Sequence, residues 1–377
     1  MKVHHIAPSR RRFMAGAVAA SSAALSGPVL GEDARSLDAL ARARGMRFGT
    51  AMAHDELGDA SVAAVIRSQC SVLTAENEFK WKHIEPREGR YRFQQADDIA
   101  RFAADNDMLL RGHTLVWSQD NRVPEWLLAK EVDLGRGTTS RMVDLMNTHI
   151  RAMTARFPGV ASWDAVNEAV QLSDGQLRSS VYTRTLGPQF IDLAFALARE
   201  AAPQAQMVYN DYMSWDAKSD HRDGVLRMLE SALSRGVKID ALGIQSHLGG
   251  SLNRPRDEIA WRRFLETVEG FGLDILITEL DCADRNVLEG DIAERDAQVA
   301  ALTKGYLDLT LSFSRVKQVV LWGISDRDSY VNEPTYPETR RRADGLPQRA
   351  HPYDDAMRPK PLREAIARAL AAAPARG

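Results

Sequence analysis

The sequence predicts an α/β fold, a single (β/α)8 barrel, and three observations favour it. Short strand-like runs alternate with amphipathic helical runs from about residue 46 to the C-terminus, which is typical of repeated β–α units. Several strand-like runs are almost continuously apolar, such as "DILIT" and "VVLWG", as expected for parallel strands covered on both faces. No glycine-rich phosphate loop follows the first run, which disfavours an open, doubly wound sheet.

Eight strand candidates follow one another along the chain, each ending in polar or aromatic residues. The candidates are Met46–Met52, Ser71–Ala75, Met108–Thr114, Ser162–Asn167, Gln206–Asn210, Ala241–Ser246, Asp274–Thr278 and Gln318–Gly323. The runs between them have helical spacing. Two apolar stripes comprise Phe190, Leu193, Ala194 and Leu197, then Trp261, Phe264, Leu265 and Val268. The barrel is expected over residues 36–375, and its longest irregular segment, 330–361, follows the eighth strand.

The N-terminus predicts an export signal over residues 1–31. "SRRRFMAGAVAASSAALSGPVLG" joins a charged segment to an Ala-rich stretch that is too short and too weakly apolar for a transmembrane helix. The arginine pair resembles a twin-arginine signal, which a receptor reads and which does not act as an anchor. An uncleaved anchor or a disordered tail is the alternative. We expect export to the periplasm or the cell exterior, with no membrane contact after the signal is removed.

Charge and cysteine content narrow the function classes. The formal net charge of -2 over 377 residues gives no reason to expect nucleic-acid binding. Cys70 enters one strand candidate and Cys282 follows the end of another, so we expect two free thiols at opposite ends of the barrel. No Cys/His cluster has metal-binding spacing, and we expect a monomer that needs no metal or cofactor.

Polar and aromatic residues gather at the carboxyl ends of seven strand candidates. In a parallel barrel these ends meet at one face, where active sites are built. The second to fourth strands end in "TAENEFKW", "RGHTLVW" and Asn167-Glu168, and the later ones end in "YNDY", "IQSHL", "ITELD" and "LWGISDRDSY". Any one of these motifs is consistent with a capped strand end. Seven motifs at the same end of successive strands indicate a shared site.

The residue types at this rim favour a sugar-binding cleft. Indole faces stack on pyranose rings, while amides, carboxylates, histidine and lysine form hydrogen bonds with hydroxyl groups. Glu168 and Glu279 come from the fourth and seventh strands, and glycosidic cleavage needs one protonated acid and one ionised carboxylate. The rim therefore predicts a glycosidase. A non-catalytic glycan-binding barrel is the alternative, but it has no need of both glutamates.

In chain order, "TAENEFKW", "GHTLVW", "WDAVNEAV", "NDY", "QSHL", "ITELD" and "LWGISDRDS" resemble the strand-end motifs of glycoside hydrolase family 10, the endo-β-1,4-xylanases. The resemblance runs from about residue 46 to "RPKPLREA" near 358–365. It implies double displacement on xylan, with Glu168 as general acid/base and Glu279 as nucleophile, and carboxyl groups about 5–5.5 Å apart. Exo action on xylo-oligosaccharides, or cleavage of another β-1,4-glycan, is the alternative.

Two further side chains fit the task of keeping Glu279 ionised. Asp281 lies two residues beyond Glu279, on the same side of its strand, and we expect it to orient His247. His247 then forms a hydrogen bond with Glu279 and holds it anionic. A helix cap is the alternative role for Asp281.

The resemblance also implies contacts between the enzyme and its substrate. It places Gln245 near Glu168 and Asn167 at the 2-hydroxyl of the sugar that is cleaved. The other substrate contacts that it implies are Glu76, Asn77, Lys80, His113, Trp117, Tyr212, Trp322 and Tyr330. A core histidine bonded to a neighbouring strand is the alternative for His113.

Three departures from the family pattern put substrate preference in doubt. After Trp117 the chain reads "SQD", where the family usually has a histidine before a Ser-Gln pair. Met213 stands where the family commonly has asparagine, and Tyr330 where it usually has tryptophan. The Arg-rich insertion "ETRRRADGLPQRAHPYDD" is expected to cover or extend the cleft. We expect Arg340–Arg342 to form a solvated charge run, with contacts to acidic side groups of xylan such as glucuronate as the alternative.

Overall fold

The computed structural model describes Met1 and residues 36–133, 138–217, 220–250, 252, 255–287 and 289–376. Apart from Met1, the export signal expected over residues 1–31 lies outside the described residues. Within the described ranges, no helix is long and apolar enough to cross a membrane.

The strands form one parallel sheet that closes on itself. Its hydrogen-bonded order is β3-β2-β1-β9-β8-β7-β6-β5-β4, and β3 also pairs with β5. The short strand β4 (Val116–Trp117) follows β3 and pairs with the end of β5, so β3 and β4 together occupy one position in the ring. The predicted fold class, a single eight-stranded α/β barrel, is therefore confirmed.

All eight strand candidates are present, with ends that move by one or two residues. The remaining strands are β1 (Arg47–Met52), β2 (Val72–Ala75), β3 (Leu109–Gly112), β5 (Val160–Asn167), β6 (Gln206–Asp211), β7 (Ala241–Ile244), β8 (Asp274–Leu280) and β9 (Val316–Leu321). Nearly every strand residue is buried, whichever side it faces, because helices cover the outside and side chains fill the inside.

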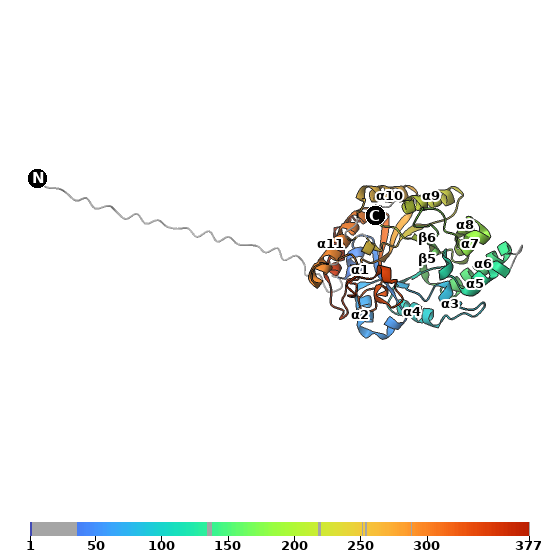
Figure 1. Cartoon of the computed structure of the whole chain (residues 1–377), viewed down its shortest axis with the longest axis horizontal. Helices are drawn as coiled ribbons and strands as arrows, with labels where there is room; N and C mark the ends of the chain where they lie inside the picture. Colours follow the sequence, from blue (N-terminus) through green and yellow to red (C-terminus); the bar gives the residue numbers. More distant parts are fainter. Residues whose placement is uncertain are drawn as a thin grey trace.

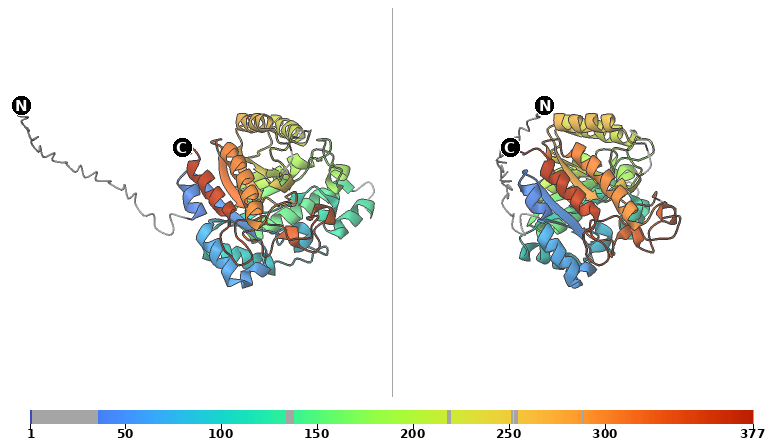
Figure 2. Two further views of the ribbon diagram at one scale, coloured as in Figure 1. Left: turned by 60° about the vertical axis from the view of Figure 1, so that its left-hand side comes forward. Right: turned by 90° about the vertical axis from the view of Figure 1, so that its left-hand side faces the viewer.

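The helices surround the sheet in chain order (Figure 1). They are α1 (Leu37–Arg42), α2 (Ala60–Gln69), α3 (Trp81–Ile84), α4 (Gln94–Asp105), α5 (Glu125–Asp133), α6 (Thr138–Arg156), α7 (Val181–Leu186), α8 (Phe190–Ala201), α9 (Asp220–Ser234), α10 (Glu258–Gly270), α11 (Ile292–Thr310) and α12 (Pro361–Ala372). Helix α12 packs against both α11 and α1, so the last helix closes the ring beside the first (Figure 2).

The two predicted apolar stripes differ in outcome. In α10 the buried residues are the predicted set, Trp261, Phe264, Leu265 and Val268. In α8 the buried face keeps Phe190 and Ala194 but is completed by Ile191, Phe195 and Ala198, while Leu193 and Leu197 are only partly buried. Helix α8 contacts α6 and α7 as well as β5 and β6, and these extra neighbours rotate the buried face.

Both cysteines are buried free thiols, as the sequence predicts. Cys70 lies two residues before β2 begins, whereas Cys282 lies two residues after β8 ends. Burial raises the pKa of the Cys282 thiol to about 12, so this sulfur stays protonated at neutral pH.

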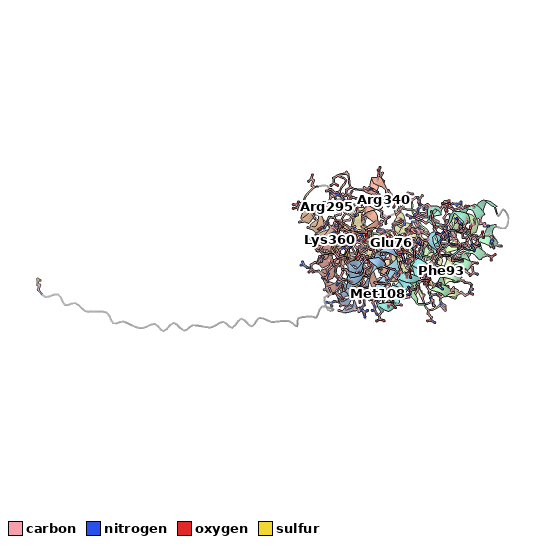
Figure 3. All side chains as sticks on the ribbon, turned by 90° about the horizontal axis from the view of Figure 1, so that it is seen from below. Glu76, Phe93, Met108, Arg295, Arg340 and Lys360 are labelled. Atoms are coloured by element: carbon pink, nitrogen blue, oxygen red, sulfur yellow. The ribbon has the colours of Figure 1, made fainter. Side chains whose placement is uncertain are left out.

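The carboxyl ends of the strands face one side of the molecule. Figure 3 shows Arg340, from the segment after β9, on the opposite side from Met108, which directly precedes β3. Glu76, the first residue after β2, lies between these two levels (Figure 3). The residues that follow the strands are therefore brought to the end of the barrel that the sequence predicts to be functional.

Candidate active site

A cleft of about 880 Å³ opens at this end of the barrel. The predicted site residues that line it are Glu76, Asn77, Lys80, His113, Trp117, Glu168, Tyr212, Gln245, His247, Glu279, Asp281, Trp322 and Tyr330. Asn167 is the predicted site residue that is not among the residues lining this cleft within the described structure. Its side chain is fully buried. Residues from seven strand ends therefore meet in one cleft, as predicted from the polar and aromatic residues at the carboxyl end of each strand.

Glu168 is the first residue after β5, and three donors hold its carboxyl group. Its φ of 55° lies in the left-handed region, which is uncommon for a residue with a side chain and often marks a functional position. Trp117 Nε1 donates to Oε2 at 2.9 Å, and Gln245 Nε2 donates to Oε1 at 2.9 Å. Gln119 Nε2 also donates to Oε2. The carboxyl group is therefore fixed in orientation.

The surroundings of Glu168 favour its protonated form. Burial is the largest cause that raises its pKa above the usual value, and the negative charge of Asp211 is the next. The hydrogen bonds from Gln245 and Trp117 oppose this rise, while the charge of Glu279 adds to it. The net effect is a carboxylic acid that keeps its proton above the pH at which a solvated glutamate loses it.

Glu279 lies in β8 and has the opposite surroundings. Asn210 Nδ2 donates to its Oε1 at 2.8 Å, and His247 Nε2 lies 3.2 Å from its Oε2. His113 Nδ1 lies 4.0 Å from Oε1. Burial alone raises the pKa of Glu279, but the hydrogen bond from His247 and the charges of His113 and His247 outweigh it, so the pKa is lowered. Glu279 is therefore ionised where Glu168 is protonated.

His247 connects Glu279 to Asp281. Its Nδ1 lies 2.7 Å from Asp281 Oδ2, while its Nε2 faces Glu279, so both contacts expected for this ring are present. Burial lowers the pKa of His247, but the charge and hydrogen bond of Asp281 dominate and raise it to about 10. The ring is thus a cation at neutral pH that donates from both nitrogens. The N-cap of the following helix, α11, is Asp291, and Asp281 does not fill that role.

His113 makes the contact with a neighbouring strand that the sequence analysis gives as its alternative role, and its substrate contact stays a prediction. Its Nδ1 lies 2.9 Å from Oδ2 of Asp164 on the neighbouring strand β5, and Arg111 forms an ion pair with the other oxygen of Asp164. These groups are buried, so the carboxylate fixes the ring and is itself neutralised. The same ring lines the cleft and lies edge-on to Trp322, with 5.2 Å between ring centroids.

Asn210, in β6, is a site residue that the sequence analysis does not single out. Its Nδ2 donates to Glu279 and, at 2.9 Å, to Asn167 Oδ1, while its Oδ1 accepts from Thr278 Oγ1 at 2.7 Å. A Cβ on Gly243 would come within 2.4 Å of Asn210 Oδ1, so a glycine on β7 leaves room for the amide. The sequence could have indicated Asn210, because residues two apart on a strand lie on the same side and Asn210 lies two residues before Tyr212.

A polar and aromatic wall forms at the ends of β2 and β4. Lys80 Nζ donates to Asn77 Oδ1 at 2.9 Å and lies 5.1 Å from the ring centroid of Trp117 and 5.7 Å from that of Trp322. Asn77 Nδ2 donates to Glu76 Oε1 at 3.1 Å. Burial raises the pKa of Glu76 to about 7, with Lys80 as the main opposing influence. The wall offers hydroxyl-binding groups next to indole faces.

Comparison with known protein families agrees with this geometry. The sequence pattern of the family described as "Glycosyl hydrolase family 10" matches residues 36–369. The chain belongs to glycosyl hydrolase family 10. The family that the strand-end motifs predict is therefore confirmed, and the protein is a glycoside hydrolase.

Two similar proteins and two similar solved structures carry xylanase names. "Endo-1,4-beta-xylanase B" from Thermotoga neapolitana is 33% identical over 270 residues, which cover 71% of this chain and 73% of that protein. "Endo-1,4-beta-xylanase 3" from Hypocrea jecorina is 33% identical over 300 residues, which cover 78% of each chain. The crystal structure of native xylanase 10B from Thermotoga maritima superposes with a TM-score of 0.77 at 31% identity, covering 89% of this chain and 98% of that one. Xylanase 10B from Thermotoga petrophila RKU-1 in complex with xylobiose also gives a TM-score of 0.77, at 30% identity, covering 89% of this chain and 97% of that one.

The departures of this family 10 member from the usual motifs lie at the cleft. Gln119, from the altered "SQD" segment, donates to Glu168 and therefore belongs to the site. Met213 lines the cleft where the family commonly has an amide, so this position offers an apolar surface in place of hydrogen-bonding groups. Tyr330 also lines the cleft. All three changes lie around the cleft that contains Glu168 and Glu279, and both glutamates are present.

The segment after β9 lines part of the cleft, and Arg340 is the lining residue that comes from the Arg-rich insertion, residues 338–355. It contains two short 3-10 helices, η6 (Tyr330–Asn332) and η7 (Glu338–Arg340). The residues of this segment beyond Tyr330 that line the cleft are Glu333, Thr335, Tyr336, Pro337 and Arg340. Arg341 donates to the backbone carbonyls of Glu333, Pro334 and Tyr336, and so holds the segment in shape.

The expectation of a solvated charge run over Arg340–Arg342 is wrong for Arg342. Its guanidinium is buried, with an ion pair of 3.1 Å to Asp284 and a second ion pair to Asp344. Buried carboxylates require such partners, and sequence proximity of three arginines does not reveal which of them meets one. Arg340, by contrast, is exposed and lines the cleft.

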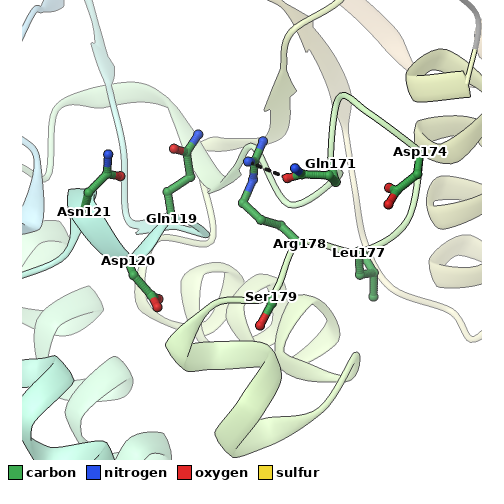
Figure 4. A pocket seen from close by; sticks show the side chains of 8 residues that line it. All are labelled: Gln119, Asp120, Asn121, Gln171, Asp174, Leu177, Arg178 and Ser179. Carbon is green, nitrogen blue, oxygen red and sulfur yellow. Dashed lines mark hydrogen bonds between the residues drawn. The ribbon is translucent and has the colours of Figure 1, made fainter.

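A second pocket of about 550 Å³ adjoins the cleft, and Figure 4 shows the residues that line it. Gln171 lines both spaces and accepts from Arg178 Nη1 at 2.7 Å, the contact drawn in Figure 4. Arg178 Nε donates to the backbone carbonyl of Glu168 at 3.1 Å, and Gln119 comes from the opposite side of the pocket. The cleft therefore continues past the acid through polar side chains.

Proposed function

We propose that this family 10 enzyme is a retaining endo-β-1,4-xylanase that hydrolyses internal xylosidic bonds of xylan. The observation that carries the proposal is the pair of glutamates in one cleft with oppositely shifted pKa values, raised for Glu168 and lowered for Glu279. Glycosidic cleavage by double displacement needs one acid and one anionic nucleophile, and this pair supplies both. The names of the relatives support xylan as the substrate class.

In the first step, Glu168 donates its proton to the glycosidic oxygen while a carboxylate oxygen of Glu279 attacks the anomeric carbon. The bond to the leaving sugar breaks, that sugar departs as a neutral alcohol, and a glycosyl ester forms on Glu279. Asn210 and His247 keep the attacking carboxylate ionised and aligned for this step. The proposed attack requires the two carboxyl groups to be about 5–5.5 Å apart.

In the second step, Glu168 takes a proton from water, and the resulting hydroxide attacks the anomeric carbon and releases Glu279 as a carboxylate. The change of role of Glu168 follows from electrostatics. The negative charge of Glu279 is one cause of the raised pKa of Glu168, and the ester removes that charge. The pKa of Glu168 therefore falls once the ester has formed, so its carboxylate stays ionised and can take the proton from the attacking water.

The endo mode is supported by the size of the cleft and by its extension on both sides of the catalytic pair. The wall at Lys80 and Trp117 lies on one side, and the pocket at Gln171 and Arg178 lies beside Glu168. Assays of reducing sugar on xylan, cellulose and xylotriose test the substrate. Rapid loss of xylan viscosity supports endo cleavage, slow loss with early release of monomer or dimer indicates exo action, and an absence of turnover indicates a binding protein.

Acidic side groups of xylan are proposed to contact Arg285 and Arg340. These two arginines line the cleft, and the charge of each opposes the rise that burial causes in the pKa of Tyr336. An exposed ion pair contributes about 0.2–1 kcal/mol, so Arg340→Glu should lower the rate on glucuronoxylan relative to unsubstituted xylan by about twofold to fivefold. Equal effects on both polymers would show that Arg340 does not discriminate between them.

We also propose that residues 1–31 direct export by the twin-arginine route and that the enzyme acts as a monomer. The support for export is "SRRRFM" followed by an Ala-rich stretch. A reporter fused to residues 1–31 should leave the cytoplasm, and Arg10→Lys with Arg11→Lys should retain it there. The support for a monomer is that one chain supplies the whole described cleft, and analytical ultracentrifugation measures the state directly.

A further inference from the structure

The hydroxyl of Tyr330 belongs to the hydrogen-bonded chain that ends at Glu279. It donates to Asp281 Oδ2 at 2.8 Å and lies 3.3 Å from His247 Nδ1. The same oxygen of Asp281 accepts from His247 Nδ1 at 2.7 Å. Two donors, a phenol and an imidazole, therefore converge on one carboxylate oxygen, and the imidazole is the group that contacts Glu279 through its other nitrogen.

Tyr330 is built to act as a fixed donor. Burial raises its pKa well above 10 and the charge of Asp281 adds to this effect, so the hydroxyl keeps its proton and Asp281 is the acceptor. The ring packs edge-on against Tyr336, with 5.6 Å between centroids. Its short helix η6 is tied down by Asn332, whose side chain donates to the carbonyl of Gln348 at 2.9 Å and accepts from the Gln348 amide at 2.8 Å.

We propose that Tyr330 is a positioning residue for the nucleophile, because its hydroxyl fixes the Asp281 carboxylate and thereby the His247 ring that holds Glu279. The proposal rests on the proposed role of Glu279 as nucleophile. An indole, which the family usually has here, carries no hydroxyl, so this link is a property of the tyrosine. The ring of Tyr330 also lines the cleft, and a test must separate the hydroxyl from the ring.

Tyr330→Phe removes the hydroxyl and keeps the ring. A buried hydrogen bond to a charged group is worth more than a neutral one, so kcat on an activated aryl xylobioside should fall roughly fivefold to tenfold, with KM changed by less than about twofold. If Tyr330 only contacted the sugar, Tyr330→Phe would instead raise KM and leave kcat almost unchanged. Tyr330→Trp should show a similar loss of kcat, because it also lacks the hydroxyl. Tyr182→Phe is the matched control, since its buried hydroxyl has no partner within the described structure and lies outside the cleft.

A double-mutant cycle tests the path through Asp281. If the hydroxyl acts by holding Asp281, Tyr330→Phe should change kcat by less than about twofold in an Asp281→Asn background. The proposal would be overturned if the double variant lost kcat by the product of the two single losses, since the residues would then act independently. A kcat of Tyr330→Phe equal to that of the unaltered enzyme would also overturn it. Thermal unfolding of each variant controls for loss of fold, and the Tyr330→Phe result stands alone if Asp281→Asn does not fold. Turnover by Glu279→Gln would instead overturn the proposed function itself.

Discussion

Asn210 Nδ2 donates to Oε1 of Glu279 at 2.8 Å, across the gap between strands β6 and β8. This bond stabilises the ionised form of Glu279 and is one of the causes of its lowered pKa. The relationship is functional under the proposed mechanism, because an amide that holds the carboxylate anionic also aligns the attacking oxygen.

We therefore expect Asn210→Ala to lower kcat/KM on an aryl xylobioside by about tenfold to a hundredfold. Without the amide, Glu279 takes up a proton at a higher pH, so the acidic limb of the pH profile should move to higher pH. Steady-state kinetics from acidic to neutral pH measure both effects. Asn147→Ala, on the outer helix α6, is the control and should leave the profile in place. An unshifted acidic limb in Asn210→Ala would contradict the assignment.

The catalytic pair predicts two different losses. Glu279→Gln should abolish turnover on every substrate, because the amide is not a nucleophile. Glu168→Ala should cost much less on aryl glycosides with good leaving groups than on xylan, because such leaving groups scarcely need a proton. Rates on the two substrate types, with exposed Glu230→Gln as control, give the comparison. Near-normal rates on xylan for both variants would remove the role assignment.

We expect Asp211 to influence the alkaline limb of the pH profile under the proposed mechanism. Its charge is the second largest cause, after burial, that raises the pKa of Glu168. Activity requires Glu168 to be protonated, so it is lost as pH rises through that pKa. Asp211→Asn removes the charge, lowers the pKa of Glu168 and should move the alkaline limb to lower pH by up to about one unit. The measurement is kcat/KM against pH for Asp211→Asn and for the unaltered enzyme. An unchanged alkaline limb would show that the charge of Asp211 does not raise the pKa of Glu168.

The sequence predicts the fold and the presence of Glu168 and Glu279 in one cleft, because both depend on patterns along single strands. Apolar runs of strand length ending in polar residues identify the rim, and strands β5 and β8 each end near one glutamate. The same reasoning does not identify Asn210 and Asp211, because each acts on a glutamate that belongs to a different strand. Which side chain meets Glu279 or Glu168 depends on the register of neighbouring strands and on the closure of the barrel, neither of which a single strand reveals.

The segment after β9 shows a second limit. Its arginines are neighbours in sequence, yet Arg340 lines the cleft and Arg342 is buried among carboxylates. Irregular segments have no repeating period, so nothing in the sequence assigns a face to each side chain. The hydroxyl of Tyr330 is hidden for the same reason, since its partner Asp281 follows a different strand.

Glu56, in the short helix η2 (Asp55–Gly58), makes stability depend on pH. Burial raises its pKa from 4.5 to about 8, and the charges of Glu76 and Asp328 add to the rise. Between these pH values the unfolded chain ionises Glu56 while the folded chain keeps it protonated, so the free energy of unfolding falls as pH rises. Glu56→Gln removes this loss and still offers an acceptor for the Ala53 amide.

We expect Glu56→Gln to stabilise the protein by an amount on the order of a few kcal/mol near pH 8 and to have little effect near pH 4.5. Urea unfolding at both pH values measures the difference, and exposed Glu230→Gln should be neutral at each. A stabilisation of equal size at the two pH values would show that proton uptake by Glu56 is not its source.

Arg342 and Arg341 are adjacent but should differ in their contribution to stability. Arg342 is buried and forms an ion pair with Asp284, which a second arginine, Arg295, also contacts. Removing one partner of a buried pair leaves an undercompensated charge, so Arg342→Ala should lower the free energy of unfolding by about 3 kcal/mol. Arg341 is exposed and donates to backbone carbonyls, so Arg341→Ala should cost less than about 1 kcal/mol. Urea unfolding near neutral pH compares the two, and equal losses would mean that Asp284 is neutralised by Arg295 alone.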